Sequence, residues 1–239
     1  MELEQGIESY KEKRITVVEG GCATLTAIFL LLLGIACFVV GGISQDRYNG
    51  LPDLGFLFAL GPICIIVFFI IISGVMVIQP NYAYVCQFCG KYVGTVRNTG
   101  LWWVNPFYSK FPISLRINNF ETSRIKVNDF NGSPIEIQCV VVWRIHDTAE
   151  ACFEVEDYRQ YLRIQSEAAL RNATSKHPYE CTKEGEIGLR SHPVEISELL
   201  RKEIGDRLDK AGIQVIEAKI SHLAYAQEIA QAMLRKQQA

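Results

Sequence analysis

The sequence predicts a membrane-anchored protein of the α+β class, with two N-terminal transmembrane helices followed by a mixed sheet, helices and a C-terminal helix. Two long runs without a charged residue lie near the start of the chain, at 20–43 and 54–78. From 79 to about 145, apolar residues recur with the period of two that is typical of strands. From residue 147 the period becomes helical, and one late strand follows. Strands first and helices later indicate α+β rather than alternating α/β.

Each uncharged run is long enough to cross a bilayer. The runs contain 24 and 25 residues, whereas about 20 apolar residues suffice for a helix to span the hydrocarbon core. The leader at 1–19 carries five Glu and a second run follows the first at once, so the first run is not a secretory signal. A polar turn at 44–53 joins the runs. The sequence therefore predicts a helical hairpin with both tails on one side.

The distribution of Lys and Arg indicates which side that is. Positive charges near span ends favour the cytoplasm. Five lie on the tails and one in the loop between the runs: Lys11, Lys13, Arg14, Lys91 and Arg97, against Arg47. We therefore expect a two-span protein of the cell membrane, with a short external loop at 44–53 and cytoplasmic N- and C-terminal parts.

Charge and cysteine usage exclude two classes of protein. From Pro80 onward the chain has 20 Lys and Arg against 19 Asp and Glu, a net charge of +1. This excludes the strong electrostatic surface expected of a nucleic-acid partner. The eight cysteines show no paired secretory framework, and a reducing cytoplasm suits them.

The segment after the second run predicts a β-hairpin and an aromatic cluster. Strands at 82–89 and 90–97 are rich in β-formers. The cluster at 101–108 contains Trp102 and Trp103. Two interpretations stay open: these rings lie at the lipid interface, where amphipathic aromatics are favoured, or they fill the core of the following domain.

Further strands are predicted at 113–120 and 123–127, and the clearest at 135–145. In the last of these the odd-numbered positions, including Trp143, are all apolar, and the even-numbered ones, including Arg144, are partly polar. Such alternation predicts a sheet covered on one face only.

Local signals also predict the helices. Asp147 is a good capping residue for a short helix, and a longer helix is expected at 157–175. A third begins at Pro193, which is favoured in the first helical turn, and ends at Gly212, a typical stop residue. The remaining expected elements are a strand at 213–224 and a helix at 227–238.

Short motifs from Gln79 to the end of the chain resemble one known family. They are QPNYA at 79–83, Phe88 with GKYVGTVR at 90–97, GLWWVNPF at 100–107, ISLR at 113–116, KVND at 126–129, GSPIEI at 132–137, VVVWRI at 140–145, QSEAALR at 165–171 and AKISHLAYA at 218–226. Their order and spacing resemble the SPFH or Band 7 domain of stomatins, prohibitins and flotillins, and the closest likeness is to bacterial members. We place this domain at 79–225.

The resemblance implies a membrane scaffold and not an enzyme. Such proteins assemble with copies of themselves, organise membrane microdomains, and regulate membrane proteins such as proteases. The implied partners are the lipid bilayer, further copies of the chain, and membrane proteases or other membrane-protein clients. The resemblance implies no catalytic, cofactor-binding or metal-binding residues in this sequence. Relatives continue into a long helix, so we expect 226–239 to be the start of a helix that is cut short.

The chemistry candidates are few. Cys86 and Cys89 resemble half of a zinc ribbon, but tetrahedral zinc needs four ligands and no second close Cys pair exists. The alternative function is thus a membrane-linked metal or thiol sensor that uses these two residues. No hydrolase, metalloprotease or phosphate-loop motif is present, and neither uncharged run contains an ionisable group that would mark a transport pathway. We therefore expect no cofactor and no small-molecule substrate.

Overall fold

The computed structural model describes residues 10–47, 55–181 and 186–229, which form two compact units. One unit, which we call the anchor unit, comprises residues 13–113. The other comprises the residues up to 12 and those from 114 onward, and we call it the α/β unit only because it contains both helices and a sheet. The secondary structure is mixed, as an α+β chain requires.

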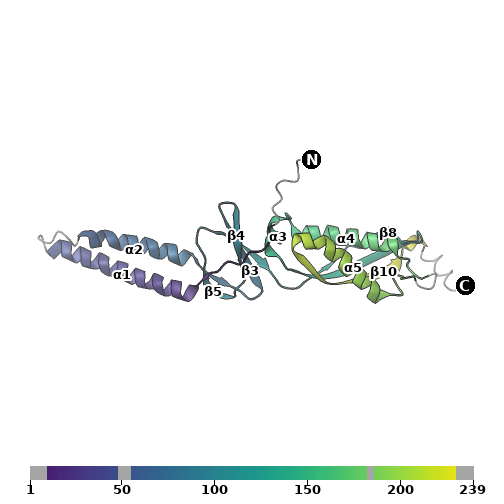
Figure 1. Ribbon diagram of the computed structural model, residues 1–239, viewed down its shortest axis with the longest axis horizontal. Helices are drawn as coiled ribbons and strands as arrows, with labels where there is room; N and C mark the ends of the chain where they lie inside the picture. Colours follow the sequence, from purple (N-terminus) through teal and green to yellow (C-terminus); the bar gives the residue numbers. More distant parts are fainter. Residues whose placement is uncertain (1–9, 48–54, 182–185, 230–239) are drawn as a thin grey trace. The chain divides into compact units, whose positions relative to one another are not determined.

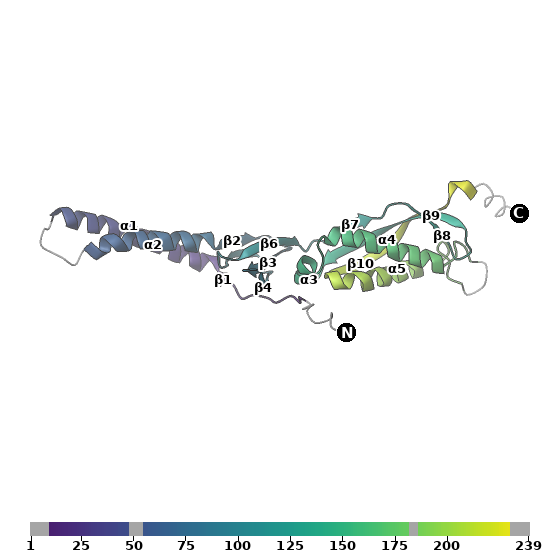
Figure 2. The ribbon, with the colours of Figure 1, turned by 90° about the horizontal axis from the view of Figure 1, so that it is seen from above.

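Two helices of the anchor unit lie side by side (Figures 1 and 2). They are α1 (Gly20–Arg47) and α2 (Gly55–Ser73). Gly34 and Gly61 face each other where the helices meet, since a Cβ added to Gly61 would lie 2.9 Å from Phe38 Cβ and 3.1 Å from the carbonyl oxygen of Gly34. Small residues at such a crossing let two backbones approach closely.

The predicted helix boundaries need correction. The first helix does not end at 43 but continues to Arg47, and residues 48–53 of the expected loop lie outside the described residues. The second helix does not reach 78, because it ends at Ser73 and Val75–Ile78 forms the strand β2. Hydropathy does not separate an apolar helix from an apolar strand, and this Val- and Ile-containing segment has high β-propensity.

The strands of the anchor unit form two small three-stranded sheets. In addition to β2, they are β1 (Val18–Glu19), β3 (Tyr82–Phe88), β4 (Lys91–Val96), β5 (Gly100–Trp103) and β6 (Ser109–Ser114). Their orders are β1-β5-β2 and β4-β3-β6. The predicted hairpin is therefore confirmed as β3–β4, and the buried residues of the unit's small core are Ile78, Cys86, Val96 and Val104.

The α/β unit consists of one sheet with helices on one of its faces (Figure 2). The strands β10 (Ile213–Tyr225), β9 (Pro134–Ile145) and β7 (Asn118–Glu121) lie in that order, and β8 (Ile125–Asn128) also pairs with β9. The helices are α3 (Thr148–Phe153), α4 (Tyr158–Lys176), α5 (Pro193–Leu208) and the 3₁₀ turn η1 (Asp209–Ala211).

The clearest predicted strand is confirmed together with its faces. The odd-numbered residues of β9 from 135 to 145 are buried, whereas the even-numbered ones are half-buried or exposed. The predicted strand at 113–120 is wrong, because β6 ends at Ser114 and β7 begins at Asn118. These two strands belong to different sheets, and an alternating pattern does not reveal such a break.

The predicted helix signals are confirmed by cap geometry. The Asp147 carboxylate accepts backbone N–H bonds from Ala149 (2.9 Å) and Glu150 (3.0 Å) at the start of α3. Asp157 does the same for α4. Gly212, with φ of +64°, follows η1 in the left-handed conformation. Of the predicted helix at 227–238, residues 227–229 are helical and the rest lies outside the described residues.

The N-terminal segment makes specific contacts that no local pattern predicts. In the α/β unit, the Glu12 carboxylate accepts hydrogen bonds from the Thr148 backbone N–H (3.1 Å) and hydroxyl (2.9 Å). In the anchor unit, the backbone N–H of Thr95 donates to the carbonyl of Lys13 (2.7 Å). The segment expected to be a simple tail is therefore part of the fold from Tyr10 onward.

Candidate membrane and assembly surfaces

Helix α1 is long and apolar enough to cross a membrane between Gly20 and Gly42, a stretch of 23 residues. At about 1.5 Å per residue it spans more than the hydrocarbon core of about 30 Å. The apolar stretch described for α2, Leu60–Ser73, is shorter. Large apolar side chains point outward from both helices: Leu25, Ile28, Phe29, Leu32, Ile63, Ile66 and Phe69 are examples, each 49–69% exposed. So much exposed apolar surface is typical of a segment that contacts lipid.

The sheet β1-β5-β2 presents an apolar outer face. In its register Val18 and Val75 flank Trp103, and Val77 lies opposite Leu101. Residues paired directly across strands, or two apart in one strand, share a face, so these five side chains form one surface. Val77 is 65% exposed and Leu101 is 40% exposed. We call this surface the apolar sheet face.

The two neighbouring tryptophans have different roles. Trp102 packs against the core of the anchor unit, whereas Trp103 belongs to the apolar sheet face. The Trp103 indole N–H donates to the carbonyl of Ile71 in the last turn of α2 (2.9 Å), which also accepts from the backbone N–H of Gly74 (3.1 Å). The core interpretation left open by the sequence is thus confirmed for Trp102, and the lipid-interface interpretation stays a prediction for Trp103.

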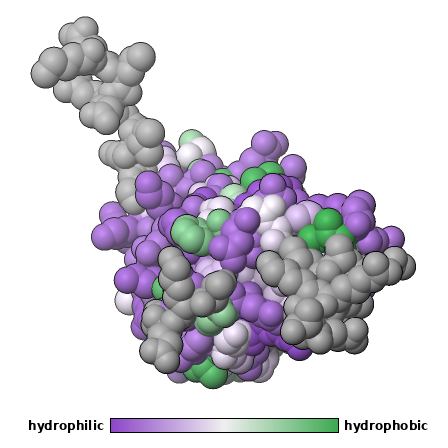
Figure 3. Space-filling view, turned by 90° about the vertical axis from the view of Figure 1, so that its right-hand side faces the viewer, coloured by the Kyte–Doolittle hydropathy of each residue, from purple (hydrophilic) through white to green (hydrophobic). Residues whose placement is uncertain are grey.

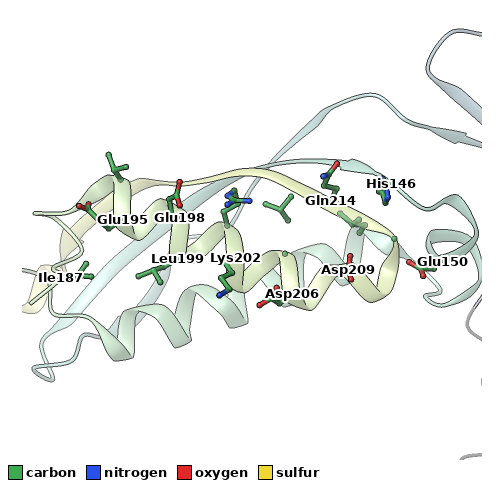
Figure 4. A pocket seen from close by; sticks show the side chains of 16 residues that line it. His146, Glu150, Ile187, Glu195, Glu198, Leu199, Lys202, Asp206, Asp209 and Gln214 are labelled. Atoms are coloured by element: carbon green, nitrogen blue, oxygen red, sulfur yellow. The ribbon is translucent and has the colours of Figure 1, made fainter. Parts of the chain in front are cut away.

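The α/β unit carries a long open groove, which we call the acidic groove (Figure 4). Its volume is about 920 Å³, and it follows α5 and the beginning of β10. Among the described residues, five carboxylates line it, against two basic side chains: Glu150, Glu195, Glu198, Asp206 and Asp209, against Arg201 and Lys202. Burial and the nearby carboxylates of Asp147, Asp209 and Glu154 raise the pKa of Glu150. The groove is therefore electronegative at neutral pH.

A smaller groove lies at the β7 edge of the sheet, on the opposite side from β10. We call it the basic groove. Its volume is about 540 Å³, and residues of β7 and of the first turns of α4 line it. Arg159 and Arg163 supply two positive charges, and Asp157 is the one carboxylate among the described residues that line it. That carboxylate accepts backbone N–H bonds from Arg159 (2.8 Å) and Gln160 (3.2 Å), so it serves as the cap of α4.

The view in Figure 3, from the right-hand side of Figure 1, shows a face on which hydrophilic residues predominate. Among the residues that carry a hydropathy colour, the hydrophobic ones are scattered singly between the hydrophilic ones. Isolated apolar residues of this kind are normal on a protein in contact with water.

The structure places Cys86 and Cys89 in different surroundings. Cys86 is fully buried in the core of the anchor unit, where burial raises the pKa of its thiol. Cys89 is exposed in the turn between β3 and β4, with φ of +46°. Within the described ranges, no group of three or more His, Cys, Asp or Glu side chains is arranged to hold a metal ion. Nothing in this geometry favours the metal or thiol sensor.

One thiol–imidazole pair is also present, in the segment before α5. Cys181 Sγ lies 3.6 Å from His192 Nδ1, and the thiol donates to the carbonyl of Glu186 (3.0 Å). The backbone N–H of Gly188 donates to the same imidazole nitrogen (3.3 Å). These contacts hold the chain locally, since both groups are engaged by the backbone.

Comparison with known proteins identifies the family. The family described as SPFH domain / Band 7 matches residues 76–239, more than two thirds of the chain. A comparison with curated proteins finds no significant match. With an apolar helix at the N-terminal side and this match over the remainder, the chain belongs to the SPFH / Band 7 family.

Proposed function

We propose that the chain is a membrane-anchored scaffold, held by α1 and α2 as a two-span hairpin with both tails in the cytoplasm. The observation that carries this proposal is the apolar surface of the anchor unit, on the helices and on the apolar sheet face. Exposing so large an apolar patch to water is unfavourable, whereas contact with lipid carries no such cost. The close approach at Gly34 and Gly61 supports a helical hairpin that inserts as one element.

The apolar sheet face extends the contact into the headgroup region. β1 ends at Glu19, directly before α1, and β2 begins at Val75, two residues after the end of α2. The sheet therefore adjoins the start of α1 and the end of α2. Valine, leucine and tryptophan side chains suit this boundary, where tryptophan is enriched in membrane proteins.

The scaffold role also includes self-assembly and the organisation of membrane components. Membership of the SPFH / Band 7 family supports it, since the match covers the whole α/β unit from Ser114 onward. The acidic and basic grooves offer protein-binding surfaces on that unit. Membrane proteases or other membrane proteins are the clients that we expect such an assembly to gather in microdomains.

Membrane extraction followed by particle sizing tests this function. The full chain should remain in the membrane pellet after an alkaline carbonate wash, because α1 and α2 are embedded in lipid. Polymer-bounded discs cut from that pellet should then contain particles with the mass of many copies, as measured by mass photometry. Release into the carbonate supernatant would contradict the anchor, and discs with a single copy each would contradict the scaffold.

A further inference from the structure

Within the described residues, the sheet of the α/β unit is open at both of its edges. Among the strands that the structure describes, β10 pairs only with β9, and β7 also pairs only with β9. The outer side of β10 therefore presents unpaired backbone N–H and C=O groups over up to 13 residues. Such edges favour pairing with another strand unless something covers them.

The surface at the β10 edge combines negative charge with apolar side chains. The acidic groove and a second hollow of about 500 Å³ lie there, and α5 and β10 line both. Val194 is 71% exposed and Ile216 is 39% exposed in this region. None of the ion pairs found among the described residues involves Glu198 or Asp206, which point outward from α5 (Figure 4).

The surface at the β7 edge has the opposite character. In the basic groove Arg159 and Arg163 are exposed and take part in none of the described ion pairs. Ile164 lines the same groove with 54% of its surface exposed. The two edges of one sheet thus carry opposite, complementary charges, and each also presents an exposed aliphatic side chain.

We propose that the acidic groove of one copy binds the basic groove of the next copy, so that β7 of the second copy lies beside β10 of the first. The proposal rests on the self-assembly proposed above and names the surfaces that carry it. Both β7 and β10 run antiparallel to β9, so the new strand pair is parallel. Because the helices cover one face of the sheet, α4 of the second copy then lies beside α5 of the first.

The charges favour a second copy over an extended peptide as the occupant. A peptide added to β10 would use one edge and leave the guanidinium groups at the other edge without a role. A second copy uses both, since complementary potentials across an interface set its register and its specificity. The contact joins two different surfaces, so it repeats from copy to copy and closes into a ring or extends as a filament.

Charge reversal on the full chain tests the contact. Variant A carries Glu198→Lys and Asp206→Lys in the acidic groove, and variant B carries Arg159→Glu and Arg163→Glu in the basic groove. All four positions are exposed, so both variants should fold with wild-type melting temperatures. Each variant alone places like charges against each other, and we expect its fraction of large particles in mass photometry to fall at least about tenfold.

Coexpression of A and B in one cell should restore large mixed particles, because the reversed groove of each variant then faces the reversed groove of the other. A matched control with Lys91→Glu and Lys176→Glu, exposed and outside both grooves, should assemble like the wild type. Large particles from A or B alone, or no rescue from well-folded A and B together, would overturn the proposed contact. Either result leaves the scaffold function standing if the wild type forms large particles, whereas a wild type of single copies contradicts that function itself.

Discussion

Replacing Trp143 by alanine is expected to lower the free energy of unfolding of the α/β unit by about 3–5 kcal/mol, the range for emptying a large aromatic core site. Trp143 is 5% exposed in β9, the strand that pairs with all the others of its sheet. Its ring lies edge-on to that of Tyr158, with centroids 6.0 Å apart. Its indole N–H has no hydrogen-bond partner among the described residues, so the loss comes from packing.

The neighbouring variant Arg144→Ala is the control for this measurement. Arg144 is exposed on the other face of β9, where its Nε–H donates to the Gln214 side-chain oxygen (2.8 Å). Loss of one exposed hydrogen bond should cost no more than about 1 kcal/mol. Chemical unfolding followed by circular dichroism measures both variants, and similar losses for the two would contradict the assignment of the core face.

Replacing Gly212 by alanine is expected to destabilise the same unit by at least about 3 kcal/mol. The left-handed conformation alone costs a residue with a Cβ about 1–2 kcal/mol. In addition, the new Cβ would lie 2.2 Å from the carbonyl oxygen of Asp147, a backbone atom that has little freedom to move. The Gly212 carbonyl also accepts hydrogen bonds from the backbone N–H groups of His146 (2.8 Å) and Asp147 (3.1 Å), so any shift of the turn disturbs the start of α3.

Gly132 provides a matched control in the same unit. It also has positive φ, +78°, but a Cβ added there would meet nothing within 4 Å. Gly132→Ala should therefore cost only the conformational part, about 1–2 kcal/mol. If the two alanine variants unfold at the same denaturant concentration, the close approach of Gly212 to the β9–α3 connection is not a feature of the protein.

Local signals in the sequence predicted much of the α/β unit. Alternation in 135–145, the capping residue Asp147, and the stop at Gly212 each act within a few residues of their position. Such features are visible in a sequence because the interactions that produce them are local.

Long-range pairing was the part that the sequence could not predict. β2 was read as the end of a membrane span, because an apolar run of four residues is compatible with either state until its partner β5 is known. The contact of Glu12 with Thr148 joins residues 136 positions apart and leaves no periodic trace. The register that aligns Val18 and Val75 with Trp103, and hence the apolar sheet face, is equally non-local.

The same reason explains why neither groove was foreseen. The carboxylates of α5 form no motif in the sequence, and their meaning depends on β10 lying at an open edge. Likewise, Arg159 and Arg163 become part of a groove only through the pairing of β7 with β9. The two cysteines singled out by spacing, Cys86 and Cys89, lie in the core and at the surface respectively.

Accessibility of a cysteine introduced at Asn49, between the two apolar helices, tests the membrane hairpin most directly. A membrane-impermeant maleimide applied to intact cells should label Asn49→Cys from outside. The native Cys89, which is exposed in the β3–β4 turn, should react only after the membrane is permeabilised. Peptide mapping by mass spectrometry assigns the label to each site. Labelling of the Asn49→Cys site only after permeabilisation, or of Cys89 in intact cells, would contradict the two-span anchor with a cytoplasmic SPFH domain.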